Sequence, residues 1–153
     1  MTSVEPVPTG YPTISPYLCV DGAADAIGFY EKVFGAVEAL RLAEPGGRIG
    51  HAELKIGDSV VMLSDEYPDR GIVGPKKIGG TPVTLSVYVP DVDATFARAM
   101  ANGARELRPV ADQFYGDRSG QFLDPFGHRW SVATHIEDVS ADELKRRAGA
   151  DDS

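Results

Sequence analysis

Hydrophobic and polar positions follow the same order twice along this chain. In each half, a short strand-like run leads into a helical stretch that opens at Val20 or at Val89: VDGAADAIGFYEKVFGA in the first half and VPDVDATFARAMANGA in the second. Small residues end both helical stretches, at 34–36 and 102–104, and another extended run follows each. A repeat of this kind indicates two copies of one supersecondary unit. Equivalent positions in the two halves are therefore expected to face the same space.

Alternation and turn residues divide each half into one helix and four strands. Helical spacing predicts helices over 23–34, ended by Gly35, and over 92–100. Alternating runs separated by Gly-rich or Pro-Gly turns predict the strands, which are 13–20, 37–42, 50–56 and 60–64 in the first half and 83–89, 106–110, 119–123 and 129–134 in the second. Each half is β-α-β-β-β, so the expected fold class is α+β.

The flanking and connecting segments have a different composition. One globular domain is expected overall, with five parts: an extended, Pro-rich N-terminal arm at 1–12, a first module at 13–65, a linker or functional loop at 66–81, a second module at 82–135, and a C-terminal tail at 136–153. In the tail, Ser140 and Glu143 have the spacing of a capping box, which predicts a short terminal helix.

Strand parity gives each sheet a helix-covered face and an opposite, mixed face. In the first strand Ile14, Leu18 and Val20 are expected under the helix. The equivalent apolar positions of the second half are 83, 85, 87 and 89. The mixed face is predicted to line a concave ligand pocket, whose candidate residues are Ser15, Tyr17, His51, Glu53, Met62, Thr84, Tyr88, Phe122 and Ser131. A solvated outer face is the alternative, but exposing Met62, Phe122 and two tyrosines together is unfavourable.

Composition excludes several classes of function. The net charge of -8 and a pI of about 4.8 argue against a nucleic-acid-binding surface, which needs clustered Lys and Arg. Cys19 is the single cysteine, so no disulfide forms within the chain and a reducing compartment is favoured. Neither a signal-peptide pattern nor a membrane-spanning run is evident. A cytoplasmic protein without membrane or nucleic-acid partners is expected.

Four segments together resemble the vicinal oxygen chelate superfamily, which includes glyoxalase I, extradiol dioxygenases and bleomycin-resistance proteins. They are PYLCVDGAADAIGFYEKVFGA, GRIGHAELKIGDSVVMLSDE, YVPDVDATFARAMANGA and DQFYGDRSGQFLDPFGHRWSVATHIEDVS, and they cover most of residues 14–140. Within the superfamily the chain is similar to the PhnB-like branch. The resemblance implies paired modules that form an eight-stranded cup around a ligand, and a homodimer.

The resemblance also implies where a metal would be held. Metal enzymes of the superfamily place one ligand at the start of each module's first strand and one on its last strand. By spacing, these positions fall on Ser15, Met62, Thr84 and Ser131. None of them is His, Glu or Asp, the donors that hold a catalytic divalent cation. No metal and no other cofactor is therefore expected, and glyoxalase-type or extradiol dioxygenase chemistry is disfavoured.

Two further groups of residues are candidates for chemistry. His51 and Glu53 lie two apart on one strand, as an acid–base pair, as part of a displaced metal site, or as a cross-strand polar ladder or dimer contact. Before the seventh strand, Arg118 is a candidate for an anionic ligand and Tyr115 for stacking or hydrogen bonding. The alternative is a turn in which residue 116 has positive φ and Asp117 pairs with Arg118.

Three functions remain open at the level of sequence. The first is a protein that binds a small organic ligand in the cup without catalysis. The second is a metal-independent isomerase or lyase that uses His51, Glu53 or Tyr115. The third is a metalloenzyme with a displaced site. His135, on the same face as Ser131, is a further candidate residue, whereas Trp130 is expected in the core.

Overall fold

The computed structural model describes residues 3–151, and it confirms an α+β fold with one β-α-β-β-β order in each half. Its strands form two separate four-stranded sheets, in the orders β1-β4-β3-β2 and β5-β8-β7-β6. Among the described strands, none pairs across from one sheet to the other, so the sheets do not close into a barrel. The chain divides into two compact units, Met1–Gly80 and Thr81–Ser153.

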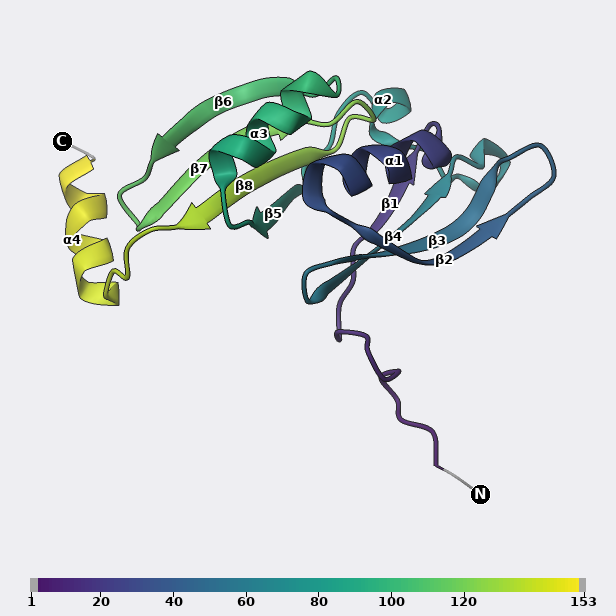
Figure 1. Cartoon of the computed structure of the whole chain (residues 1–153), viewed down its shortest axis with the longest axis horizontal. Helices are drawn as coiled ribbons and strands as arrows, with labels where there is room; N and C mark the ends of the chain where they lie inside the picture. The colour runs from purple at the N-terminus through teal and green to yellow at the C-terminus, as the bar shows by residue number, and fades with distance from the viewer. Residues whose placement is uncertain (1–2, 152–153) are drawn as a thin grey trace. The chain divides into compact units, whose positions relative to one another are not determined.

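The first unit carries the strands β1 to β4 and the helix α1 (Figure 1). Their bounds are β1 Tyr17–Val20, α1 Ala23–Phe34, β2 Val37–Ala43, β3 Ile49–Ile56 and β4 Ser59–Asp65. β1 runs parallel to β4, and the β2–β3 and β3–β4 pairs are antiparallel. α1 lies over one face of this sheet and buries Ile27, Tyr30 and Val33 at helical spacing. Gly35, in the left-handed region at φ 67°, ends the helix.

The carboxylate of Asp65, the last residue of β4, binds the first N–H groups of α1. Asp65 Oδ1 accepts hydrogen bonds from the N–H groups of Gly22 (3.1 Å) and Ala23 (2.9 Å), and its Oδ2 accepts one from Ile49 N–H (2.8 Å). The first N–H groups of a helix have no partner within the helix, and a negative charge there is favourable. The last residue of the sheet's β4 strand thereby sets where the helix begins.

The second unit repeats this arrangement with different residues. Its elements are β5 Thr84–Tyr88, α3 Val92–Ala101, β6 Arg105–Asp112, β7 Asp117–Leu123 and β8 Arg129–His135. Asp91 caps α3 by accepting a hydrogen bond from Ala94 N–H. At the end of β8, the Thr134 hydroxyl accepts from Val92 N–H and donates to Val89 O. Thr134 thus has the role in this unit that Asp65 has in the first.

The predicted turn at 124–127 is held by its own aspartate. Asp124, which is buried, accepts from the N–H groups of Phe126 and His128 and, at 2.9 Å, from the indole N–H of Trp130. Trp130 is only 2% exposed, which confirms its predicted place in the core. The turn therefore satisfies the one polar atom that a buried tryptophan brings with it.

The remaining elements are short or terminal. They are the 3-10 turn η1 Pro68–Arg70, the helix α2 Pro75–Ile78 and the C-terminal helix α4 Ala141–Asp151. The Ser140 hydroxyl accepts from Glu143 N–H at 3.2 Å, so the predicted helix start is confirmed. Arg147 donates to Phe114 O at 2.8 Å and pairs with Glu137, which holds α4 to the second unit. None of the helices formed by residues 3–151 is long and apolar enough to cross a membrane.

The predicted assignment of side chains to faces is wrong at three positions. Ile14 is 83% exposed and Val83 is 58% exposed, because both precede the paired part of their strand and no helix covers them. Phe122 is fully buried and makes an edge-to-face contact with Phe96 of α3. It therefore lies on the helix-covered face and not on the mixed face, where it was predicted to contact ligand.

Candidate functional site

On the mixed face of the first unit, four side chains form one chain of hydrogen bonds. His51 Nε2 lies 2.7 Å from Glu53 Oε2, and the Tyr17 hydroxyl lies 2.8 Å from His51 Nδ1. At the other end, the Tyr11 hydroxyl donates to Glu53 Oε1. β3 brings His51 and Glu53 to the same face because they are two residues apart on a strand. Of the four, Tyr11 was missed by the sequence analysis, since the arm that carries it has no periodic pattern.

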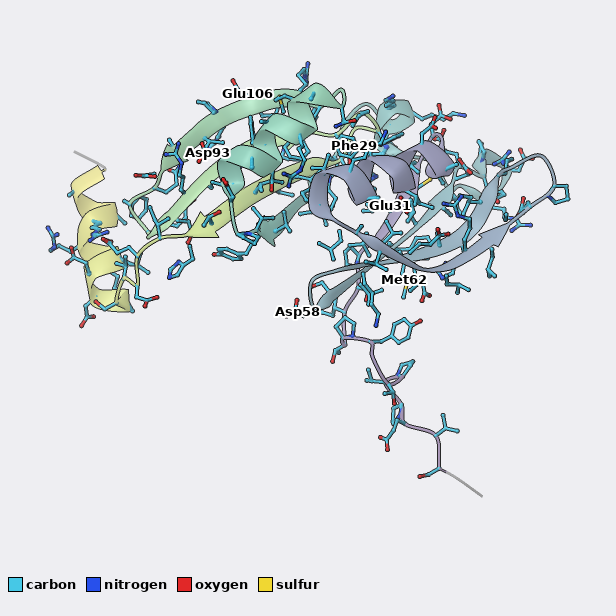
Figure 2. The ribbon with its side chains drawn as sticks, viewed as in Figure 1. Phe29, Glu31, Asp58, Met62, Asp93 and Glu106 are labelled. Atoms are coloured by element: carbon cyan, nitrogen blue, oxygen red, sulfur yellow. The ribbon has the colours of Figure 1, made fainter. Side chains whose placement is uncertain are left out.

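A cavity of about 510 Å³ lies beside these hydrogen-bonded side chains. Three of its lining residues were predicted for a ligand site, namely Ser15, Glu53 and Met62. The N-terminal arm contributes Pro8, Tyr11 and Pro12, and the remaining lining residue is Thr13, which follows the arm. Met62 points away from α1 in Figure 2, as its position between the buried Val61 and Leu63 requires. The arm and the mixed face of the sheet together make this cavity.

Hydrogen bonding keeps the carboxylate in this cavity ionised. The Tyr11 hydroxyl and then the His51 ring lower the pKa of Glu53 below its ordinary value, and the bond to Glu53 raises the pKa of Tyr11. At neutral pH, Glu53 is therefore a hydrogen-bond acceptor with a negative charge. A carboxylate with a lowered pKa is also a weak general base.

The second unit holds a similar group of residues around Asp117. Its carboxylate accepts from the Tyr88 hydroxyl at 2.8 Å and lies 2.8 Å from His135 Nδ1. His135 Nε2 lies 2.7 Å from Asp138 Oδ1. Asp117 is only 6% exposed, whereas His135 is half-exposed. From the sequence, Asp117 is predicted only as a partner of Arg118, because nothing in the sequence indicates that residues 88 and 135 meet at it.

These residues border a second cavity of about 240 Å³. Its lining includes the predicted residues Tyr88, Tyr115 and Ser131, and the full set is Ser86, Val87, Tyr88, Tyr115, Asp117, Ser119, Ser131 and Ala133. The Tyr115 hydroxyl is 3.5 Å from Ser119 Oγ. Hydrogen bonds that Asp117 and then Asp138 accept from the ring raise the pKa of His135, and the bond to Asp117 raises the pKa of Tyr88.

Arg118 does not lie in the connection before the seventh strand, where it was predicted to meet an anionic ligand. It belongs to β7 and points to the α3 side, where it pairs with Asp93 at 2.9 Å and with Asp112 at 3.0 Å. Figure 2 labels Asp93 on α3. The alternative pairing with Asp117 is also wrong, because adjacent residues of a strand face opposite sides. Two carboxylates already occupy this guanidinium, and they raise its pKa further.

Gly116, in the turn before β7, has the positive φ that was predicted if this segment is a structural turn. This residue has φ 97°, and a Cβ there would collide with the carbonyl oxygen of Glu137. The amide of Ile136 and that of Glu137 both donate to Gly116 O. The segment that follows β8 is thereby held against the turn, and Tyr115 is fixed at the edge of the second cavity.

The four positions that hold metal in the superfamily's enzymes can now be located. Tyr17 pairs with Met62 and Ser86 pairs with Ser131 in parallel registers, so the two last-strand positions are equivalent, as the spacing predicted. Ser15 and Met62 line the first cavity and Ser131 lines the second, but Thr84 is exposed and lines neither.

This set of donors does not fit a divalent cation. Three neutral hydroxyls and one thioether offer neither the imidazole nor the carboxylate groups that such ions need. Within residues 3–151, no group of three or more His, Cys, Asp and Glu residues is placed to hold a metal ion.

The duplicated β-α-β-β-β unit is the architecture that the resemblance to the vicinal oxygen chelate superfamily implied. A model of the Glyoxalase/Bleomycin resistance protein/Dioxygenase superfamily matches residues 12–132, and the chain belongs to that superfamily. An uncharacterized protein of Mycobacterium tuberculosis is 45% identical over 137 residues, which are 88% of this chain and 81% of the relative.

Solved structures support the same assignment. TioX from Micromonospora is similar with a TM-score of 0.62 at 26% identity, and the match covers 82% of this chain and 99% of TioX. A PhnB protein from Bacillus cereus is similar with a TM-score of 0.61 at 21% identity, covering 80% of this chain and 99% of that protein. At that lower identity the likeness concerns the fold alone.

Proposed function

We propose that this protein binds a small organic ligand in the cavity of the first unit, without a metal ion. One observation carries the proposal: at positions where the superfamily's enzymes hold a metal, Ser15 and Met62 instead line a 510 Å³ cavity beside an ionised carboxylate. A volume of this size suits a compact organic molecule. The combination of apolar and polar lining also suits such a ligand better than an inorganic ion.

The lining indicates what the ligand offers to the protein. Glu53 accepts hydrogen bonds, so the ligand presents an N–H or O–H group to it. Met62 and the rings of Pro8, Tyr11 and Pro12 provide an apolar wall, against which a flat or aliphatic part of the ligand packs. Because Tyr11 belongs to the arm, part of the binding surface lies outside the β-α-β-β-β unit.

A thermal-shift screen of metabolites and fragments, followed by calorimetry, tests the proposal. We expect a stabilising ligand whose affinity falls about tenfold in Glu53→Gln, since a charged hydrogen bond becomes a neutral one. Glu106→Gln, an exposed position on β6, is the matched control and keeps the affinity. The proposal fails if no compound stabilises the protein, if Glu53→Gln binds equally well, or if divalent ions alone give the stabilisation.

A metal-independent isomerase or lyase is a second candidate, favoured by the hydrogen-bonded series Tyr17–His51–Glu53. Both ring nitrogens of His51 are occupied, so Tyr17 is the group at the exposed end that can exchange a proton with a substrate. Tyr115, the third residue predicted for catalysis, lines the cavity of the second unit. Incubation of the stabilising ligand with the protein, followed by mass and NMR analysis, separates the two functions. Conversion that is lost in a folded His51→Ala variant supports the enzyme, and recovery of unchanged ligand supports binding alone.

A further inference from the structure

The proposed ligand site lies in the first unit, so the cavity of the second unit has no role in it. Three hydroxyls border it, each from a different strand: Ser86 on β5, Ser119 on β7 and Ser131 on β8. Tyr88 and Tyr115 add two aromatic rings, and Asp117 adds a carboxylate on a side chain that is only 9% exposed. Among the eight lining residues there is no Lys, Arg or His.

The cluster of ionisable side chains at Asp117 has a negative net charge. Asp117 and Asp138 hold His135 between them, so this cluster carries a net charge of -1 when the imidazole is protonated and -2 when it is neutral. Arg118, the next residue in β7, lies on the opposite face and is already paired with Asp93 and Asp112. The nearest arginine along the strand therefore does not neutralise Asp117.

We propose that this cavity binds the ammonium group of a small organic amine. Asp117 is its counter-ion, since a carboxylate oxygen accepts more than one hydrogen bond and the Tyr88 and His135 bonds leave acceptor capacity. The seryl hydroxyls accept the remaining N–H groups, and the tyrosine rings attract the cation through their faces. An ammonium ion carries several donors on one small group, which matches several acceptors converging from three strands.

Other ligand classes fit this lining less well. An anion would meet a buried carboxylate with no cationic side chain in the lining, and that is electrostatically unfavourable. A divalent metal ion would find one carboxylate and neutral hydroxyls, which is too few charged ligands. A neutral alcohol satisfies the hydroxyls but leaves the charge of Asp117 without a further partner. The 240 Å³ volume restricts the amine to a compact one.

Nuclear magnetic resonance of the ¹⁵N-labelled full chain tests this inference with three probes of similar shape: propylammonium, propanol and propionate. We expect propylammonium to shift the amide signals of Ser86, Ser119 and Ser131 in a saturable way, and the other two to bind at least about tenfold more weakly. Equal binding of propanol or propionate, or no saturable shift with the amine, overturns the proposal.

Substitutions locate the site and separate it from the first cavity. Asp117→Asn is expected to weaken amine binding about tenfold, whereas Glu53→Gln leaves it unchanged. If Asp117→Asn does not fold, Ser131→Ala and Ser86→Ala carry the test, each with an expected loss of about threefold. Unchanged amine affinity in these variants overturns the inference. Loss of amine binding in Glu53→Gln but not in Asp117→Asn would assign the amine to the first cavity and overturn it as well.

Discussion

At the scale of single residues, buried or half-buried carboxylates organise most of the polar structure. Asp65 and Asp124 each accept at least three hydrogen bonds from groups of the folded chain, while Glu53 and Asp117 each join a tyrosine to a histidine. The first two bind mainly backbone N–H groups and the latter two bind side chains at the cavities. Asp65 and Asp124 thus stabilise the fold, whereas Glu53 and Asp117 belong to the candidate sites.

We expect Asp65→Ala to lower the free energy of unfolding by about 2–4 kcal/mol. The substitution leaves the N–H groups of Gly22, Ala23 and Ile49 without their acceptor, two of them at the start of α1. Urea denaturation followed by circular dichroism measures the change. Asp58→Ala, in the exposed turn between β3 and β4, is the control and should cost less than about 0.5 kcal/mol. Equal losses in the two variants would contradict the role given to Asp65.

We expect the pKa of His135 to lie above the ordinary histidine value of 6.5, because Asp117 and Asp138 stabilise its charged form. Since folding raises this pKa, the contribution to stability is fully present below pH 6.5 and is lost as pH rises through the folded-state pKa. The ring is half-exposed, so solvent screening keeps the contribution small.

Titration of the ring protons by nuclear magnetic resonance measures the pKa of His135 directly. Asp117→Asn should move it down toward the ordinary value, whereas Glu106→Gln should leave it in place. A pKa at or below 6.5 in the unmodified protein would show that the two carboxylates do not hold the ring in solution.

At the scale of secondary-structure elements, α3 is fixed to β7 by an apolar and an ionic contact. Phe96 of the helix meets Phe122 of the strand, and Asp93 of the helix pairs with Arg118 of the strand. Gly120, between the two strand residues, leaves room for the Phe96 ring, which a Cβ would approach to 3.0 Å. This alternation places both Phe122 and Arg118 on the helix side of β7, away from the second cavity.

We expect Phe122→Ala to destabilise the protein by about 3–5 kcal/mol, as loss of a fully buried phenylalanine does. Amine binding at the second cavity should persist wherever the variant remains folded. Phe114→Ala, whose ring is 39% exposed, serves as the comparison and should cost less than about 1.5 kcal/mol. A small effect at Phe122 would place its ring on the mixed face after all.

Periodicity is what made these elements predictable. The helix Ala23–Phe34 and the strand order follow from repeated apolar positions and glycine turns, and the structure reproduces them. The errors fall where periodicity gives no information. Tyr11 comes from an aperiodic arm, the partners of Asp117 come from two other strands, and the parity of β7 depends on where the strand begins. Hydrogen bonds between side chains that are far apart in the sequence, such as those of Tyr11 and Asp117, could therefore not be predicted from periodicity.

At the scale of the whole molecule, each sheet has two edge strands with unpaired backbone groups, β1 and β2 in one and β5 and β6 in the other. β2 is one such edge, and its side chains Val37, Leu40 and Leu42 are all exposed. Exposed apolar side chains on an edge strand favour association with another chain. These features are consistent with the homodimer that the family resemblance led us to expect.

We expect sedimentation equilibrium at micromolar concentration to give a mass about twice the 16.4 kDa of one chain. Leu40→Lys combined with Leu42→Lys should shift the equilibrium toward the monomer if the β2 edge takes part, because the charges oppose burial. Lys substitutions at Val4 and Val7 in the arm are the matched control. A monomer in the unmodified protein would contradict the expectation.

The duplicated helix cap has a consequence for how such a protein changes over time. Asp65 and Thr134 anchor the two helices with different chemical groups at the same place, so each half meets its folding requirements from its own residues. The residues that face the cavities are other ones, on other strand positions. Under the two binding proposals made above, mutations can accordingly alter the ligand preference of one half while the other half keeps its fold and its proposed ligand. Duplication followed by such independent drift would make the two proposed sites separately adjustable.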